Sequence, residues 1–239
     1  MIFGGINILE LCAQIPVLMF SLSFHEFFHS FTAYKMGDYS QKSEGRLTLN
    51  PLVHIDWIGF FMVLVARFGW AKPVMIDPNN FAKGEGGEAD NRRMKRAMAL
   101  TAAAGPAANL LLALIAAIIL APLSVHYLDV RFFMVFTDIM SAEFQIPMYA
   151  RVIMMLLGNM LQLNLVLAVF NMLPIPPLDG SKIFSAFLSP RLYFKFIRGS
   201  SVTSIIFVVL ILTGAADRVL SPIISFLYLG FFYLSLLIL

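Results

Sequence analysis

The chain has 239 residues, of which 59% are apolar and 13% charged, and its mean hydropathy is +0.83. Soluble domains carry about 25% charged residues, so this composition excludes a disordered chain and argues against a water-soluble enzyme. The net charge of +3 is too small for a nucleic-acid-binding protein, and a single cysteine, Cys12, excludes an internal disulfide and a cysteine-based zinc site. We therefore expect the lipid bilayer, and no nucleic acid, as a partner.

The first apolar segment predicts a membrane helix over residues 6–35. It has neither the basic start nor the small-residue cleavage site of a signal peptide, so we expect the helix to be retained.

The next apolar run, residues 55–66, is too short to cross a hydrocarbon core of about 30 Å. Lysine and arginine residues flank it on both sides, which by the positive-inside rule puts both flanks in the cytosol. This pattern predicts a re-entrant or interfacial segment. Alternating residues over 46–50 and the β-prone residues 74–76 after Pro73 predict two short β-strands on the same cytosolic side.

Further apolar runs predict the remaining membrane helices, over residues 97–121 (closed by Pro122), 147–170, 202–212 and 220–239. Cations precede the first of these runs and follow the second, whereas the connection between them is mainly acidic. The positive-inside rule then puts the N-terminus outside and the C-terminus inside.

These segments predict an all-α polytopic membrane protein with about five transmembrane helices, a re-entrant segment and short cytosolic-side β-strands. We expect a single domain over residues 1–239, with a core over 6–200 and C-terminal hydrophobic helices over 202–239.

Three ionisable residues, His25, Glu26 and His29, form an H-E-x-x-H pattern near the end of the first helix. Positions i and i+4 share one helix face, so both imidazoles can bind one metal. Glu26 is turned about 100° from His25 and can reach a water on that metal without being a ligand. The pattern is typical of a zinc site with a glutamate general base. The alternative is a membrane helix with two satisfied histidines and a buried glutamate, although ionisable groups in membrane spans are functional by default.

A catalytic zinc usually has three protein ligands and a water, and Asp179 is the candidate third ligand. Three prolines precede it and Gly180 follows it, so the chain can turn and the carboxylate can face the core. The alternative is that Asp179 only caps the next helix.

Asn109 is an amide at membrane depth, at the end of the Gly105–Asn109 motif in the second long helix. It can hydrogen-bond a substrate carbonyl or a developing oxyanion. The alternative is a structural hydrogen bond between helices.

In this order, the motifs at His25–His29, Gly105–Asn109 and Asn171–Gly180 resemble those of the site-2 protease family of intramembrane zinc metalloproteases. Residues 45–51, 54–56 and 69–74 are similar to the short bacterial and archaeal type without PDZ or CBS domains.

The resemblance implies one Zn²⁺ per chain, bound by His25, His29 and Asp179, with Glu26 as the catalytic acid/base. It implies that Asn109 and Asn171 help to place the substrate. The expected activity is cleavage of single-span or signal-peptide-like membrane proteins in or near their transmembrane segments. We expect a multi-pass protein of a prokaryotic cell membrane, with its active site toward the cytosol.

His54 has two interpretations: it supports or replaces a metal ligand, or it is an interfacial histidine beside Asp56. Two other functions compete with proteolysis. A metal transporter would use the same ligands and should show further acidic or histidine residues along its spans. A non-catalytic membrane scaffold would not need the intact His, Glu, His and Asp set.

Overall fold

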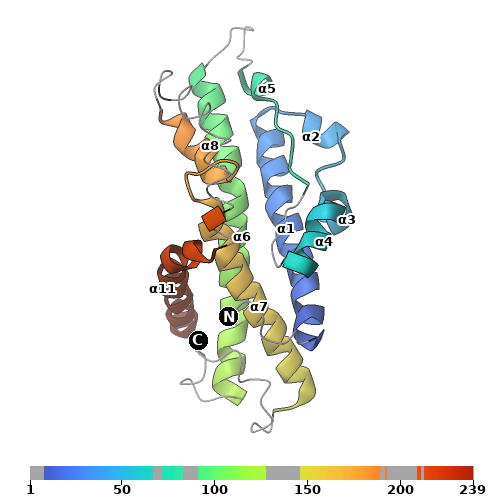
Figure 1. Ribbon diagram of the computed structural model, residues 1–239, viewed down its shortest axis with the longest axis vertical. Coiled ribbons are helices and arrows are strands. Elements are labelled where there is room, and N and C mark those ends of the chain that lie inside the picture. The colour runs from blue at the N-terminus through green and yellow to red at the C-terminus, as the bar shows by residue number, and fades with distance from the viewer. Residues whose placement is uncertain are drawn as a thin grey trace.

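The computed structural model describes residues 8–66, 72–82, 91–127, 146–188, 192, 209–210 and 213–238. Long helices form an elongated body (Figure 1): α1 (Ile8–Met36), α6 (Asn91–Tyr127), α7 (Met148–Asn171) and α11 (Ala215–Ile238). Short helices complete the described fold: α2 (Ser40–Ser43), α3 (Pro51–His54), α4 (Trp57–Ala66), α5 (Pro78–Ala82) and α8 (Asp179–Ala186). Figure 1 shows α2, α5 and α8 at the end of the body where α6 begins.

The central element is α6, which packs against α1, α5, α7, α8 and α11. Its alanines at 113, 116 and 117 are fully buried, and such small side chains let helices approach closely in a membrane. They form one core cluster with larger side chains from α6, α7 and α11, including Leu120, Met154, Leu161, Leu165 and Phe232. This cluster fixes α6 against α7 and α11, and separate contacts join α6 to α1 and α8.

Three helices are long and apolar enough to cross a membrane, over Arg92–Tyr127, Met148–Asn171 and Arg218–Leu237. Large apolar side chains point outward on them, among them Leu111 on α6 and Phe226 and Leu237 on α11. An apolar exterior of this extent suits lipid rather than water. The prediction of a helical, multi-pass membrane protein is confirmed at this level.

The two faces of α1 differ in composition. Its buried face is polar over residues 21–30, whereas the aromatic residues Phe20 and Phe31 are exposed. The buried polar side chains are Ser21, Ser23, His25, Glu26, His29 and Ser30.

The predicted β-strands are wrong: neither residues 46–50 nor residues 74–76 form a strand in the structure. Side chains bond the backbone that a sheet would use. His54 Nε2 donates to the Thr48 carbonyl (2.8 Å) and Gln41 Nε2 to the Met75 carbonyl (2.7 Å).

Three predicted boundaries also change. The second long helix, α6, begins at Asn91, six residues before its predicted start at residue 97, and Pro122 does not close it, because α6 continues to Tyr127. The last helix begins at Ala215, five residues before its predicted start at Leu220. The run at 55–66 does form a helix, α4, whereas most of the run at 202–212 lies outside the described residues.

Candidate metal centre

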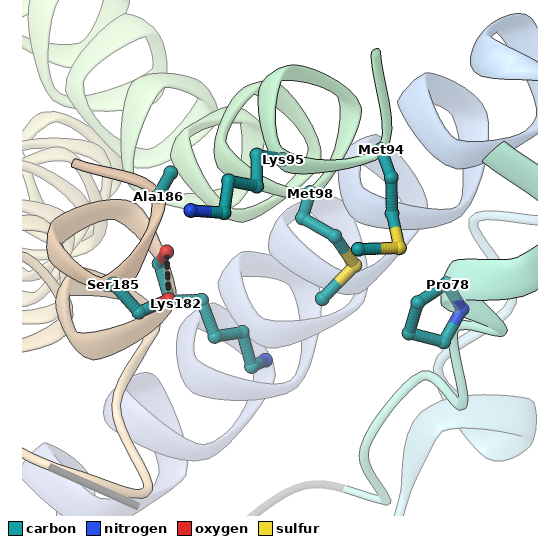
Figure 2. Close-up of a pocket in the computed structure, with 7 residues that line it drawn as sticks. All are labelled: Pro78, Met94, Lys95, Met98, Lys182, Ser185 and Ala186. Carbon is teal, nitrogen blue, oxygen red and sulfur yellow. Dashed lines mark hydrogen bonds between the residues drawn. The ribbon is translucent and has the colours of Figure 1, made fainter. Parts of the chain in front are cut away.

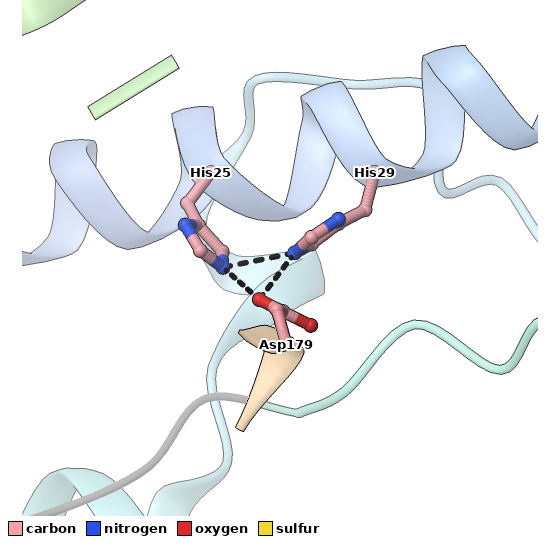
Figure 3. A group of neighbouring side chains, drawn as sticks. All are labelled: His25, His29 and Asp179. Atoms are coloured by element: carbon pink, nitrogen blue, oxygen red, sulfur yellow. Dashed lines mark hydrogen bonds and ion pairs between the residues drawn. The ribbon is translucent and has the colours of Figure 1, made fainter. Parts of the chain in front are cut away.

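The two imidazoles of α1 converge on one carboxylate oxygen from α8 (Figure 3). His25 Nε2 and His29 Nε2 lie 2.9 Å apart. Asp179 Oδ2 lies 3.2 Å from the first and 3.0 Å from the second. The exposed fractions of His25, His29 and Asp179 are only 4%, 5% and 6%, so the cluster is shielded from solvent.

The second nitrogen of each imidazole is held by α6. His25 Nδ1 donates to Asn109 Oδ1 and His29 Nδ1 donates to the Thr101 carbonyl, both at 2.6 Å. An oxygen acceptor at Nδ1 keeps the proton there, so the Nε2 lone pair is available to a metal. This is how metal-binding histidines are usually oriented.

Asp179 does not cap α8. The N-cap residue is Leu178, and no side chain makes a cap hydrogen bond there. The Asp179 carboxylate instead turns to the histidines, and its Oδ1 accepts a hydrogen bond from Lys182 Nζ at 3.1 Å. Gly180 makes this turn possible, because a Cβ there would overlap the carbonyl oxygens of Met172 and Leu173.

The donor set fits zinc. Two neutral imidazole nitrogens and one carboxylate oxygen lie within 4.8 Å of one another, and a tetrahedral zinc with ligand bonds near 2.0–2.2 Å would separate such atoms by roughly 3.3 Å. Because both Nδ1 atoms donate to α6, the two Nε2 atoms and Asp179 Oδ2 form a buried set of acceptors that needs a shared cation, either a proton or a metal ion. Within the described ranges, this is the one cluster of three or more metal-ligating side chains.

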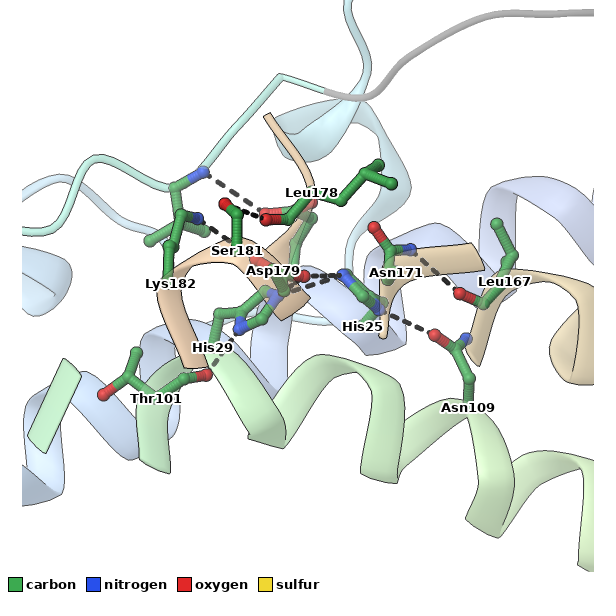
Figure 4. A network of polar contacts seen from close by, with 12 residues as sticks. His25, His29, Thr101, Asn109, Leu167, Asn171, Leu178, Asp179, Ser181 and Lys182 are labelled. Atoms are coloured by element: carbon green, nitrogen blue, oxygen red, sulfur yellow. Dashed lines mark hydrogen bonds and ion pairs between the residues drawn. The ribbon is translucent and has the colours of Figure 1, made fainter. Parts of the chain in front are cut away.

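The other predicted site residues lie around this centre. Glu26 is buried, and its Oε2 accepts a hydrogen bond from the Val74 amide at 3.2 Å. Asn171 ends α7 and donates to the Leu167 carbonyl of its own helix (3.0 Å), as Figure 4 shows. His54 is 1% exposed, is bonded to Thr48 through Nε2, and is not part of the metal-ligating cluster.

A second line of polar residues behind the ligands was not predicted. Asn109 Nδ2 donates to Asn164 Oδ1 at 2.7 Å, and Asn164 Nδ2 donates to Ser21 Oγ at 2.8 Å. This chain ties α6 to α7 and α1 at the level of the ligands. The one signal in the sequence was the amide of Asn164 between leucines at membrane depth.

Gly105, which begins the Gly105–Asn109 motif on α6, lies directly against the metal ligands. A Cβ on Gly105 would overlap His29 Nε2 and would lie 2.6 Å from His25 Cε1. The absence of a side chain at this position therefore leaves room for the imidazole rings of His25 and His29 against α6.

Comparison with known proteins identifies the family. The model of "Peptidase family M50" matches residues 13–213. The chain belongs to peptidase family M50. One relative, "Putative zinc metalloprotease YwhC" of Bacillus subtilis, is 35% identical over 211 residues, covering 88% of this chain and 85% of its own. Another, "Putative zinc metalloprotease Rip2" of Mycolicibacterium smegmatis, is 28% identical over 206 residues, covering 84% and 66%. No solved structure gives a significant match.

The M50 match confirms the resemblance to site-2 proteases. The chain is a membrane-embedded zinc metalloprotease, and the cluster of two histidines and one aspartate is its candidate zinc site.

Proposed function

We propose that this M50 protease hydrolyses peptide bonds in or near the transmembrane segments of single-span or signal-peptide-like membrane proteins. The observation that carries the proposal is the buried cluster of His25, His29 and Asp179, whose helices pack against α6 and α7, two helices apolar enough to cross a bilayer. A metal centre that lies among membrane helices can be approached from within the bilayer by a substrate that is itself a membrane protein.

Each residue of the centre has a distinct part. His25, His29 and Asp179 hold the zinc, which when bound lowers the pKa of its water and polarises the scissile carbonyl. Glu26 takes a proton from the attacking water and delivers it to the leaving amide nitrogen. The hydrogen bond from the Val74 amide keeps the Glu26 carboxylate oriented while the proton moves.

The two asparagines take different parts in this proposal. Both ends of the Asn109 amide are bonded within the protein, to His25 and to Asn164, which supports a positioning role for the ligand. Asn171 precedes the proline-rich turn that leads to Asp179, and its side chain is partly exposed. We assign substrate placement to Asn171.

We also propose that the active site faces the cytosol. The end of α6 with Arg92, Arg93, Lys95 and Arg96 lies at the same end of the body as α8 (Figure 1), and the positive-inside rule favours the cytosol for such a cluster. On α4, Trp57, Ile58 and Phe61 are more than half exposed. These side chains support a segment that lies at the interface or re-enters the bilayer.

The decisive experiment compares Glu26→Gln with the unmodified chain in zinc-loaded vesicles that contain a labelled single-span substrate. General acid–base catalysis is worth about 10²–10⁴-fold, so we expect cleavage to fall by that factor while the variant keeps one zinc per chain. Glu44→Gln is the matched control, because Glu44 is an exposed acid whose nearest ion-pair partner, Arg46, is 4.0 Å away.

Unimpaired cleavage by Glu26→Gln would overturn the assignment of the base. Movement of zinc across the vesicle membrane without cleavage would favour the transporter. A chain that neither holds zinc nor cleaves would be a scaffold.

A further inference from the structure

Apart from the metal centre, the described part of the chain has a cavity of about 120 Å³ between α5, α6 and α8, next to the turn that carries Asp179. Figure 2 shows the residues that line it. Lys95, Met94 and Met98 come from α6, and Pro78 comes from α5. Lys182, Ser185 and Ala186 come from α8. One water needs about 10–15 Å³ of such space, so the cavity has room for a polyatomic group.

Two cations line this cavity, and none of the described residues that line it is acidic. Lys95 Nζ donates to the Leu188 carbonyl at 3.1 Å, and no ion pair joins it to a carboxylate of the described residues. Lys182 Nζ bonds Asp179 Oδ1, whose carboxylate also faces both histidines. The charge of Asp179 is therefore shared among several partners, and the cavity keeps a net positive character.

The walls specify the chemistry of a ligand. Two ammonium groups favour an oxyanion that accepts several charge-assisted hydrogen bonds, as a phosphate group does. The methionines and the proline add an apolar wall, which fits a phosphate group with an alkyl part better than a bare ion.

The outer face of α8 supports a lipid as the source of that group. Phe187, the residue after the cavity-lining Ala186, is 81% exposed, and Phe184 is 46% exposed. Phenylalanine side chains favour lipid over water, and α8 lies at the end of the body where α6 begins with Arg92, Arg93, Lys95 and Arg96 (Figure 1). In a protein that spans the bilayer, such a cluster of cations beside an apolar surface is attracted to anionic headgroups, which places the cavity near them.

We propose that this cavity binds a phosphate group, supplied by an anionic phospholipid or by free phosphate, between Lys95 and Lys182. The site is distinct from the metal centre, although Lys182 contacts both. The binding step does not depend on the proposed proteolysis, so the two can fail separately.

The test measures binding directly on the full-length, zinc-loaded protein. One arm titrates fluorescent phosphatidylglycerol into the protein in phosphatidylcholine vesicles, and the other titrates inorganic phosphate in detergent by calorimetry. Lys95→Gln should weaken binding about tenfold, the loss of one charge-assisted hydrogen bond. Arg96→Gln is the matched control, since Arg96 is exposed on the same helical turn and does not line the cavity.

A second variant guards against a folding defect. Ala186→Asp keeps both lysines and adds a negative charge to the cavity wall, so it should also weaken binding. Cleavage of substrate in pure phosphatidylcholine should be unchanged in Lys95→Gln.

Binding of phosphatidylglycerol alone supports a lipid headgroup as the occupant. Binding of both probes, or of phosphate alone, supports a site that takes free phosphate. The proposal is overturned if neither probe binds, or if Lys95→Gln and Arg96→Gln weaken binding equally.

Discussion

A substitution at Gly105 is the simplest test of whether the close packing of α6 against the zinc ligands is needed for zinc binding. Gly105→Ala should improve the intrinsic helix propensity of α6 by about 1 kcal/mol. We nevertheless expect it to lower zinc affinity at least about tenfold and to abolish most cleavage, because the new Cβ would overlap His29 and lie 2.6 Å from His25 Cε1.

Zinc content by mass spectrometry and affinity by competition with a chelator measure this effect. Gly230→Ala is the matched control, since a Cβ on Gly230 meets no atom within 4 Å. If Gly105→Ala bound zinc as tightly as Gly230→Ala, the packing of α6 against the ligands would not limit the site.

Asn109 tests a second contact at the same scale. If Asn109 positions His25, Asn109→Ala should weaken zinc binding about 10–100-fold, the usual effect of losing a residue that orients a metal ligand. If it binds substrate instead, zinc affinity should stay constant and KM should rise. Asn171→Ala provides the contrast, because we expect that variant to raise KM without loss of zinc.

The metal ligands could be predicted from sequence because their chemistry is local. Helical spacing alone brings His25 and His29 to one face, and the prolines before Asp179 predict a turn. The contacts of Thr101, Gly105 and Asn164 could not be predicted, because they depend on how α6 and α7 pack against α1. One sequence does not specify that register.

At the scale of elements, a buried hydrogen-bond cluster around Asp38 holds residues 74–80, the segment whose Val74 amide contacts Glu26. Asp38 is fully buried just beyond the end of α1, and its carboxylate accepts hydrogen bonds from Ser40, Gln41, Asp77 and Asn80. Gln41 also bonds the Met75 carbonyl. The same segment supplies the Val74 amide that contacts Glu26.

These bonds make the attachment of that segment sensitive to acid. Burial acts to raise the pKa of Asp38, but the hydrogen bonds from Ser40, Asn80, the Asp77 amide and Gln41 outweigh it, so the pKa lies below its usual value of 3.8. A lowered pKa in the folded state means that the carboxylate stabilises the fold above about pH 4. The stabilisation is lost as the pH falls from there through the folded-state pKa.

Asp38→Asn should therefore lower the free energy of unfolding by about 1–3 kcal/mol at neutral pH and flatten its dependence on pH below about pH 4. Thermal unfolding in detergent across this pH range measures both effects. Glu44→Gln is the control for the loss of an acid. An unchanged pH dependence in Asp38→Asn would contradict the role assigned to the cluster.

The same cluster explains why the strand predicted at residues 74–76 is absent. A strand needs a partner edge, and here side chains of α1 and the short helix after it bond this backbone. The long helices were predicted with boundary errors of a few residues, because apolar length identifies a span better than it identifies an end. Pro122 is the clearest case: a proline inside a membrane helix is tolerated when neighbouring groups compensate for the lost hydrogen bond.

At the scale of the whole molecule, the distribution of apolar side chains on α11 indicates a membrane span rather than a helix that is buried in protein on all sides. Phe226 is 75% exposed, whereas Phe232 on the same helix is 6% exposed and belongs to the core cluster with α6 and α7. A helix with one face in the core and an apolar face outward requires lipid on that outer side.

Spin labels at these two positions test that arrangement in a Cys12→Ser background, since Cys12 is exposed and would also react. A label at Phe226→Cys should collide with dissolved oxygen and not with a water-soluble nickel chelate, because oxygen partitions into hydrocarbon and the chelate does not. A label at Phe232→Cys should be shielded from both, and one at Glu44→Cys should meet the chelate freely. If the chelate reached position 226 as readily as position 44, α11 would face water, and the bilayer would cover a different surface of the protein.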